Sequence, residues 1–316
     1  MGYRKYVEVS MTRFIKPVAS AILSLAIVAG AAMPAFAQDG GNTSGRANDR
    51  VDLRPKFRTG DQTRFTMDLN ITSTQQAGEA GAVAQTVKQT LGLALKVKEA
   101  KADGTAKLEM VYESIKLEAT SPLMTMTFDS SQPKDKDDPT GQLLRPLVGL
   151  TLALETDERG SITKVTPQVP AGPAGAAVPT NLLEQFTAAD VVKGLFGPIL
   201  SISAGSGFAK VGESWVNEST MQGSLGNMSL KNTYTLRSHE GGNAILDING
   251  TVGLASAPNG GLADIKDGSI KGTANWDTKA GMLKSMEMTQ RMQVATRVGD
   301  QSTSSTQDMT VRVQRK

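Results

Sequence analysis

The sequence predicts a mainly β protein: a large antiparallel curved sheet, forming a half-barrel or open barrel, with one main helix against its concave face. Three observations predict this fold. Apolar residues alternate over unusually long segments, short sequences rich in Asp, Asn and Gly separate those segments, and one segment carries an apolar stripe at helical spacing. No helical pattern recurs regularly between strands, which argues against a doubly wound α/β fold.

The strand prediction depends on long runs of alternation. Apolar residues occupy one parity over residues 65–71, 83–97 and 286–298, and Gln89 and Gln290 are among the polar residues that interrupt it. At about 3.3 Å per residue, fifteen residues from 83 to 97 would extend some 50 Å. Ordinary strands have five or six residues, so these segments favour a broad twisted sheet that curls on itself over a compact sandwich.

Turn sequences separate the strand-like runs. Residues 102–104, 157–160, 240–243 and 277–281 supply Asp, Asn and Gly, which suit Asx turns and positive φ. This spacing predicts a meander, in which sequential strands become neighbours. Residues 167–180 contain four prolines and cannot enter a sheet interior.

A helix is predicted directly after the proline-rich segment. Asn181 can cap it, with Glu184 three residues on, and Gly197-Pro198 should end or kink it. Its apolar stripe consists of Leu182, Leu183, Phe186, Ala189, Val192, Leu195, Phe196 and Ile199. A second, short helix is expected over residues 141–147.

The N-terminal region has the pattern of an export signal. A basic stretch at residues 11–16 precedes an apolar run, and Ala35-Phe36-Ala37 fits the cleavage rule. We therefore expect a signal peptide over 1–37 with cleavage between Ala37 and Gln38, a flexible tether over 38–50, and a single β-rich domain over 51–316. Met11 is a better start than Met1, and the sequence leaves both open. The localisation expected is periplasmic or secreted, with no stable membrane span after cleavage.

Charge and cysteine content narrow the class of protein. The formal charge of +3 belongs to residues 1–37, and without them 30 basic and 30 acidic residues remain. A neutral chain is not expected to bind nucleic acid. The chain contains no Cys, so it has no disulfides, which fits a bacterial envelope protein better than a stapled secreted one.

The chain offers little catalytic chemistry. The Gly-acid pairs Gly60-Asp61 and Gly212-Glu213 each precede an alternating run and are interpreted as turns that begin strands. The single His, His239, lies at a predicted hairpin tip and has no nucleophile pattern around it. Asp135 and Asp137 match a calcium loop incompletely. We therefore expect no catalytic residue, no metal and no cofactor.

Methionine is the remaining unusual feature. After residue 37 the chain has eleven Met against ten aromatic residues, and most lie on predicted strands. Flexible, polarizable Met is over-used on adaptable apolar binding surfaces, although a plain core would also contain it. The residues predicted to line an apolar trough are Leu93, Leu95, Phe186, Phe196, Met286, Met288 and Met292.

Several motifs in order resemble a known family. The motifs are "KFRTGDQTRFTMDL", "FDSSQPKD", "LVGLTLALETDERGSITKV", "GFAKVGESW", "NTYTLRS" and "GTANWDTKAGML", and the resemblance covers roughly residues 55–295. They resemble a family of exported bacterial proteins of unknown function that share a VG(D/E)SW phrase and paired D…G hairpins. By architecture alone the chain is also similar to the outer-membrane lipoprotein carriers and related lipid-binding half-barrels, which implies a curved sheet with helices on its concave, apolar face.

Three functional hypotheses follow. The favoured one is an exported, non-enzymatic protein that binds or carries an apolar molecule, such as a lipid or acyl chain, in the cell envelope. The alternative is a structural or assembly component of the envelope that binds another protein at a sheet edge or face. The third is a hydrolase whose carboxylates converge only in space.

Overall fold

The computed structural model describes residues 50–76, 82–122, 124–132, 139–168, 186–202, 205–223, 226–256, 263–298 and 301–316. Its helices there are α2 Pro139–Leu144 and α4 Ala189–Leu200, with a 3-10 turn η5 at Arg145–Leu147. Its strands are β1 Val51–Asp52, β2 Gln62–Gln76, β3 Ala82–Ala100, β4 Ala106–Ser121, β5 Met124–Asp129, β6 Thr151–Thr156, β7 Ile162–Gln168, β8 Phe208–Ala209, β9 Ser214–Gly223, β10 Gly226–Glu240, β11 Asn243–Ser256, β12 Ala263–Asp277, β13 Met282–Val298 and β14 Gln301–Arg315.

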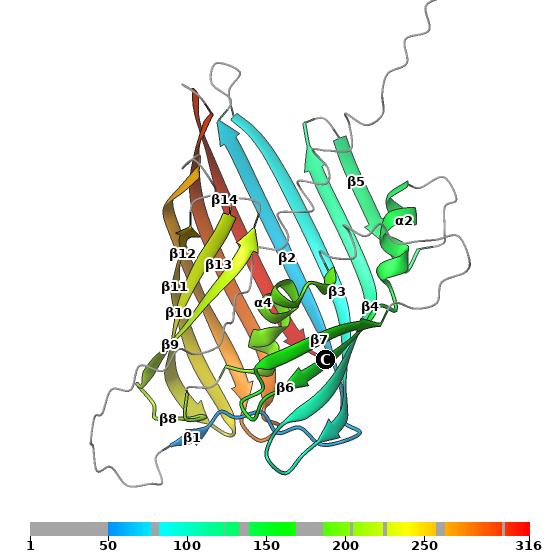
Figure 1. Cartoon of the computed structure of the whole chain (residues 1–316), viewed down its shortest axis with the longest axis vertical. Coiled ribbons are helices and arrows are strands. Elements are labelled where there is room, and N and C mark those ends of the chain that lie inside the picture. The colour runs from blue at the N-terminus through cyan, green and yellow to red at the C-terminus, as the bar shows by residue number, and fades with distance from the viewer. Residues whose placement is uncertain are drawn as a thin grey trace, which may run out of the picture.

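One 12-stranded antiparallel sheet dominates the molecule. Its order is β7-β6-β4-β3-β2-β14-β13-β12-β11-β10-β9, with β5 also beside β4. The end strands β7 and β9 do not pair with each other, so the sheet is open. Figure 1 shows the sheet curling around α4, which contacts β7, β9 and the central strand β13. The predicted curved antiparallel sheet with a main helix on its concave face is confirmed.

The long strands follow the predicted alternation. In β2, Phe65, Met67, Leu69 and Ile71 are all buried, and the same holds for one parity of β3 and of β13. These residues share one face because register partners in neighbouring strands point the same way. Val83, at the start of β3, departs from the pattern and is exposed. Alternation indicates which face a side chain occupies, but not how far along the strand that face is covered.

The strand β4 has two different neighbours on one side. Residues 106–111 pair with β6, and residues 116–121 pair with β5. Tyr112 lies at this fork, where its N–H donates to Leu150 and its carbonyl accepts from Gly149. A register shift beside Tyr112 leaves Glu113 exposed, where it pairs with Arg64 at 2.9 Å. The fork lets β6 and β7 diverge from β5 while Tyr112 stays buried.

The two Gly-acid pairs are turns with equivalent hydrogen bonds. The N–H of Gly60 donates to the carbonyl oxygen of Val97, and the N–H of Val97 donates to the carbonyl oxygen of Asp61. In the same way, the N–H of Gly212 donates to the carbonyl oxygen of Leu236, and the N–H of Leu236 donates to that of Glu213. Both glycines have positive φ, 94° and 86°. The pairs therefore begin β2 and β9 against a neighbouring strand, as predicted, and the repeated motif is structural.

The helix differs in its bounds from the prediction. The predicted cap, Asn181, lies outside the described residues, and α4 begins at Ala189. The helix continues through Gly197-Pro198 and ends at Leu200, two residues beyond Pro198. Proline removes a single hydrogen bond donor, and near the end of a buried helix packing outweighs that loss. The short predicted helix at residues 141–147 corresponds to α2 and η5.

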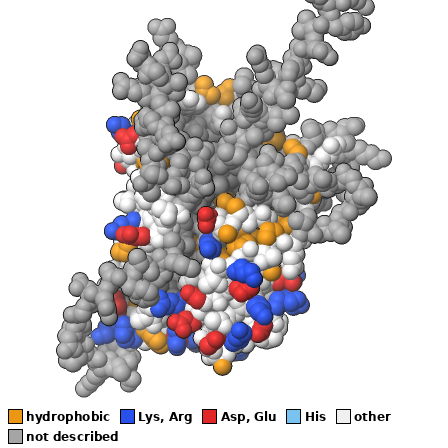
Figure 2. All heavy atoms as spheres, in the orientation of Figure 1, with side chains coloured by type: hydrophobic (Ala, Val, Ile, Leu, Met, Phe, Trp, Pro, Cys, Tyr) orange, Lys and Arg blue, Asp and Glu red, His pale blue; other side chains and the backbone are white. Residues whose placement is uncertain are grey.

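The buried apolar residues form a single cluster that begins at Val51, where the folded part was expected to start. The predicted signal peptide, most of the predicted tether, the Asp135–Asp137 loop and most of the proline-rich segment lie outside the described residues. Charged side chains lie on the outer surface. Figure 2 shows acidic and basic side chains interspersed over the lower half of one face. Cross-strand ion pairs such as Lys231–Glu218 at 2.8 Å and Arg312–Glu287 at 2.9 Å are among the exposed charged side chains.

Candidate ligand-binding site

The concave side of the sheet is the candidate site. We call it the inner face and define it by the strand positions in register with Leu93 of β3 and Met288 of β13. All seven predicted lining residues are buried on the side that faces α4 or on the helical segment itself. Leu93 and Leu95 come from β3, Met286, Met288 and Met292 come from β13, and Phe186 and Phe196 come from residues 186–200.

The structure brings only some of these residues together. Leu93 pairs with Tyr112, whose ring meets those of Phe186 and Phe196 at centroid distances of 6.0 Å. Met292 lies much farther along the sheet than Leu95, because it aligns through β14 and β2 with Gln85. Gln85 and Leu95 are ten residues apart on β3, which at 3.3 Å per residue is about 33 Å. The predicted lining set therefore describes a long face and not one compact pocket.

Tyr112 is the main residue that the sequence analysis missed. Its hydroxyl donates a hydrogen bond to the carbonyl oxygen of Phe186 at 3.3 Å, inside the core. Burial raises the pKa of the Tyr112 phenol, so it stays protonated and can donate. The alternation of Leu108, Met110 and Tyr112 along one parity was the signal that could have found it.

The helix α4 occupies one end of the inner face. Gly160, in the turn between β6 and β7, packs so closely on the end of α4 that a Cβ there would lie 2.5 Å from the carbonyl oxygen of Leu200. The twelve residues of α4 extend about 18 Å at 1.5 Å per residue. The seventeen residues of β13 extend about 56 Å. The helix therefore spans roughly a third of the length of the face on which it lies.

Beyond α4 the inner face stays apolar and buried. Ile71, Val87, Met292 and Val294 lie toward the opposite end of the sheet, and each is at most 6% exposed. Within the described part of the chain, the buried polar residues are Gln89, Thr156, Ser219, Asn232, Thr278 and Gln290, none of which is charged. The inner face is thus apolar beyond the helix, and an unpaired charge on it would be costly.

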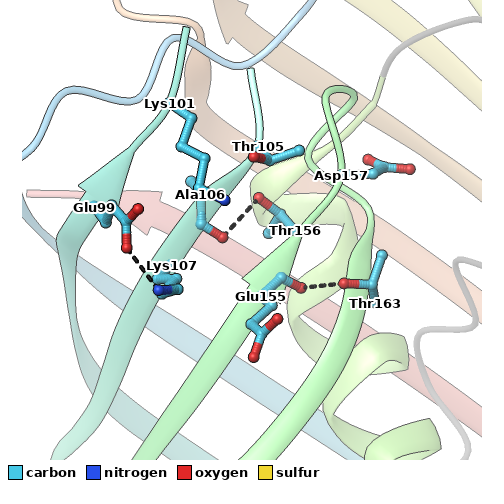
Figure 3. A pocket seen from close by; sticks show the side chains of 9 residues that line it. All are labelled: Glu99, Lys101, Thr105, Ala106, Lys107, Glu155, Thr156, Asp157 and Thr163. Atoms are coloured by element: carbon cyan, nitrogen blue, oxygen red, sulfur yellow. Dashed lines mark hydrogen bonds and ion pairs between the residues drawn. The ribbon is translucent and has the colours of Figure 1, made fainter. Parts of the chain in front are cut away.

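A separate, polar pocket of about 310 Å³ lies on the surface between the β3–β4 and β6–β7 hairpins (Figure 3). It contains Glu99, whose carboxylate is 2.7 Å from Lys107, and Glu155, which is 2.9 Å from Lys164. Hydrogen bonds from these lysines lower the pKa of both carboxyl groups. Both carboxylates are therefore ionised at neutral pH, unlike an acid prepared to donate a proton.

Other chemistry is sparse in the described part of the chain. His239 is exposed, and its Nε2 lies 3.2 Å from the hydroxyl of Thr278. The described residues contain no group of three or more His, Cys, Asp or Glu placed to hold a metal ion. They also contain no helix that is both long enough and apolar enough to cross a membrane.

The fold and the inner face define an open antiparallel half-barrel with a helix on its concave side. A family model described as a family of unknown function, DUF6263, matches residues 103–167 and 177–283. The chain belongs to this family, which confirms the resemblance to a family of unknown function.

Two further comparisons complete this result. A search of the curated proteins finds no match. Among solved structures, one entitled "Lipid-protein interactions in lipovitellin" is similar with 8% identity and a TM-score of 0.46, over 83% of this chain. The chain covers 25% of the length of that protein.

Proposed function

We propose that this protein binds and carries an apolar molecule, such as a lipid or acyl chain, on the inner face of its sheet. The observation that supports this proposal is the mismatch between α4 and the face it packs against. The helix is about 18 Å long, and the apolar face continues past it along strands of about 56 Å. A sheet needed only to bury one short helix would not need strands of this length.

The residues of the inner face suit a variable apolar ligand. Met67, Met228, Met288, Met292 and Met309 are all buried on it. Unbranched Met side chains change rotamer at little cost and fit ligands of irregular shape. Each methylene group that leaves water contributes about 0.8 kcal/mol, so a chain of ten or more could be held with micromolar affinity.

Extraction of the purified protein tests this proposal. We would express the full chain, purify the protein without detergent, extract it with organic solvent and identify the extract by mass spectrometry. Acyl compounds at a fixed molar ratio to protein support the proposal. A separate, unextracted portion of the folded protein must also bind a fluorescent acyl probe, and a blank extract together with no probe binding would refute the proposal.

The same sample tests the alternative of an envelope assembly component. Such a component would associate through its surface without needing a ligand. Concentration-dependent association in sizing experiments, with a blank extract, would favour this alternative. A monomer that carries lipid would favour the carrier.

We further propose that the protein is exported and that cleavage follows Ala37. The support is the order of basic, apolar and small residues in the first 37 positions. N-terminal sequencing of protein from the envelope fraction should begin at Gln38. Recovery of the intact N-terminus from the cytoplasm would contradict export.

A further inference from the structure

Amide side chains lie in neighbouring rows across the middle of the inner face. Gln290 of β13 aligns through Ile270 and Gly250 with Asn232 of β10. On the other side Gln290 pairs with Met309 of β14. We call Gln89, Asn232, Gln290 and Gln307 the amide belt.

The two remaining members lie next to this row. Gln307 is two residues from Met309 on β14, which makes it a diagonal neighbour of Gln290. Gln89 is two residues from Val87, which aligns with Met309 through Ile71. Gln307 lies in the row on one side of Gln290, and Gln89 lies in the row on the other side. The belt therefore covers three rows, about 13 Å along the strands at 3.3 Å per residue, and extends from β3 to β10.

The belt contains buried polar atoms without hydrogen-bond partners. Gln89 is 4% exposed, and Asn232 and Gln290 are each 6% exposed. Within the described part of the chain, the side-chain oxygens of all three, and Nε2 of Gln307, have no partner. The nitrogen of Gln290 has only the weak acceptor Sδ of Met292, at 3.8 Å.

These atoms are concentrated in one place. Seven buried side-chain atoms lack a partner in the described residues, in Gln89, Trp215, Asn232, Asn275, Trp276, Gln290 and Gln307. Four of the seven belong to the belt. A fifth belongs to Trp215, whose register partner Tyr234 is two residues from Asn232 on β10. Leaving a buried polar atom unpaired is destabilising, whereas an apolar side chain of the same shape would not be. Folding alone therefore gives no reason for amides at these positions.

We infer that the amide belt binds the polar head of the apolar ligand, and that this head is uncharged and donates hydrogen bonds from hydroxyl or amide groups. This inference rests on the proposed function and adds the class of ligand. Carboxamides both donate and accept, so the belt can pair with a hydroxyl and with a carbonyl at once. A monoacylglycerol has this chemistry, with a hydrocarbon chain that fits the apolar rows beside the belt.

Charge favours an uncharged head over an ionic one. The buried polar residues of the described chain are all uncharged. Arg315, on the inner parity at the end of β14, is already paired with Asp277 at 2.6 Å. A carboxylate or phosphate at the belt would be desolvated with no cation to pair with.

Three probes with the same hydrocarbon chain test this inference: monooleoylglycerol, methyl oleate and oleate. After delipidation we expect monooleoylglycerol to bind at least about tenfold more tightly than either of the others, because only it offers uncharged donors. Equal binding of all three, or tighter binding of oleate, would overturn the inference and leave the proposed function standing. Binding of none would refute the proposed function itself.

Matched variants locate the effect. Gln290→Met replaces the amide with an apolar chain of similar length and should weaken monooleoylglycerol binding about tenfold while leaving methyl oleate unchanged. It should unfold at the same or a higher urea concentration, because it removes an unpaired polar atom. Gln89→Leu gives a second, independent variant of the same kind. Gln293→Met, an exposed position on the opposite face of the same strand as Gln290, is the matched control and should change the binding of neither ligand.

The variants also separate a ligand site from a structural or hydrated belt. If Gln290→Met lowers stability and leaves the preference for monooleoylglycerol intact, the amides serve the fold or hold water only, and the inference is wrong. If the preference disappears while stability is kept, the belt recognises the head group.

Discussion

The hydroxyl of Tyr112 donates a hydrogen bond to the carbonyl oxygen of Phe186 at 3.3 Å, and it joins the fork of the sheet to the chain that leads into α4. The Tyr112 ring also meets those of Phe186 and Phe196 edge-on. Aromatic pairs in this arrangement contribute beyond their buried area. This contact fixes the helical segment against β4, at one end of the inner face.

Removing the hydroxyl group tests this contact. Tyr112→Phe keeps the ring packing and should lower the free energy of unfolding by about 1 kcal/mol, because the Phe186 carbonyl loses its donor. Urea denaturation measures the change. The control is Tyr234→Phe, since the structure shows no hydrogen bond from that buried hydroxyl within the described residues, and it should be neutral or slightly stabilising. Equal losses in both variants would contradict the assigned role.

Removing the aromatic ring of Phe196 from α4 should have a larger effect on the free energy of unfolding. Phe196 is fully buried, so Phe196→Ala should lower the free energy of unfolding by about 3–5 kcal/mol through lost contacts and a cavity. The control is Phe208→Ala, because Phe208 is only partly buried and contacts the guanidinium of Arg54 at 4.4 Å. That variant should lose far less. A small loss at Phe196 would mean that α4 contributes little to the fold.

Because the Gly-acid turn occurs twice, replacing its glycine with alanine should lower stability by the same amount at two distant sites. Gly60 and Gly212 both have positive φ and free space where a Cβ would lie. Alanine at either site should therefore cost about 1–2 kcal/mol from backbone strain alone. Gly205 also has free space but no positive φ, so Gly205→Ala should change stability little. Thermal or urea unfolding measures the stability of the three variants. Equal changes in stability in all three would disprove the strain argument.

Acid should weaken the contact between β12 and β14. Burial alone would raise the pKa of Asp277, but hydrogen bonds from the N–H of Ala280 and from Arg315 outweigh it and lower the pKa below 3.8. A lowered carboxyl pKa stabilises the fold above the unfolded value, and this stabilisation is lost as pH falls through the folded value. Asp277→Asn should therefore lose less stability between pH 7 and pH 3 than the unchanged protein.

The control for this pH effect is Asp264→Asn, at an exposed ion pair with Lys266. It should keep the pH dependence of the unchanged protein, since exposed pairs contribute little. Urea midpoints at the two pH values are the measurement. An unchanged pH dependence in Asp277→Asn would show that the Arg315 pair is not what acid weakens.

Much of the architecture could be predicted because its signals are local. The parity of Phe65, Met67 and Leu69 indicated one face of a strand, and Gly60 and Gly212 indicated turns. The bounds of α4 could not be predicted, since Pro198 within the last turn is tolerated only in a buried helix. The fork at Tyr112 could not be predicted either, because it depends on β5 and β6 both pairing with β4.

The sequence by itself determined the strands, their turns and the side on which each side chain lies, because alternation and turn chemistry act between residues close in the chain. Only the tertiary structure decided that Gln89, Gln290, Gln307 and Asn232 form one belt. In the sequence Gln89 and Gln290 merely interrupt two distant runs of apolar residues. The register across the intervening strands sets their alignment. That register results from packing along the whole sheet, which no single segment contains.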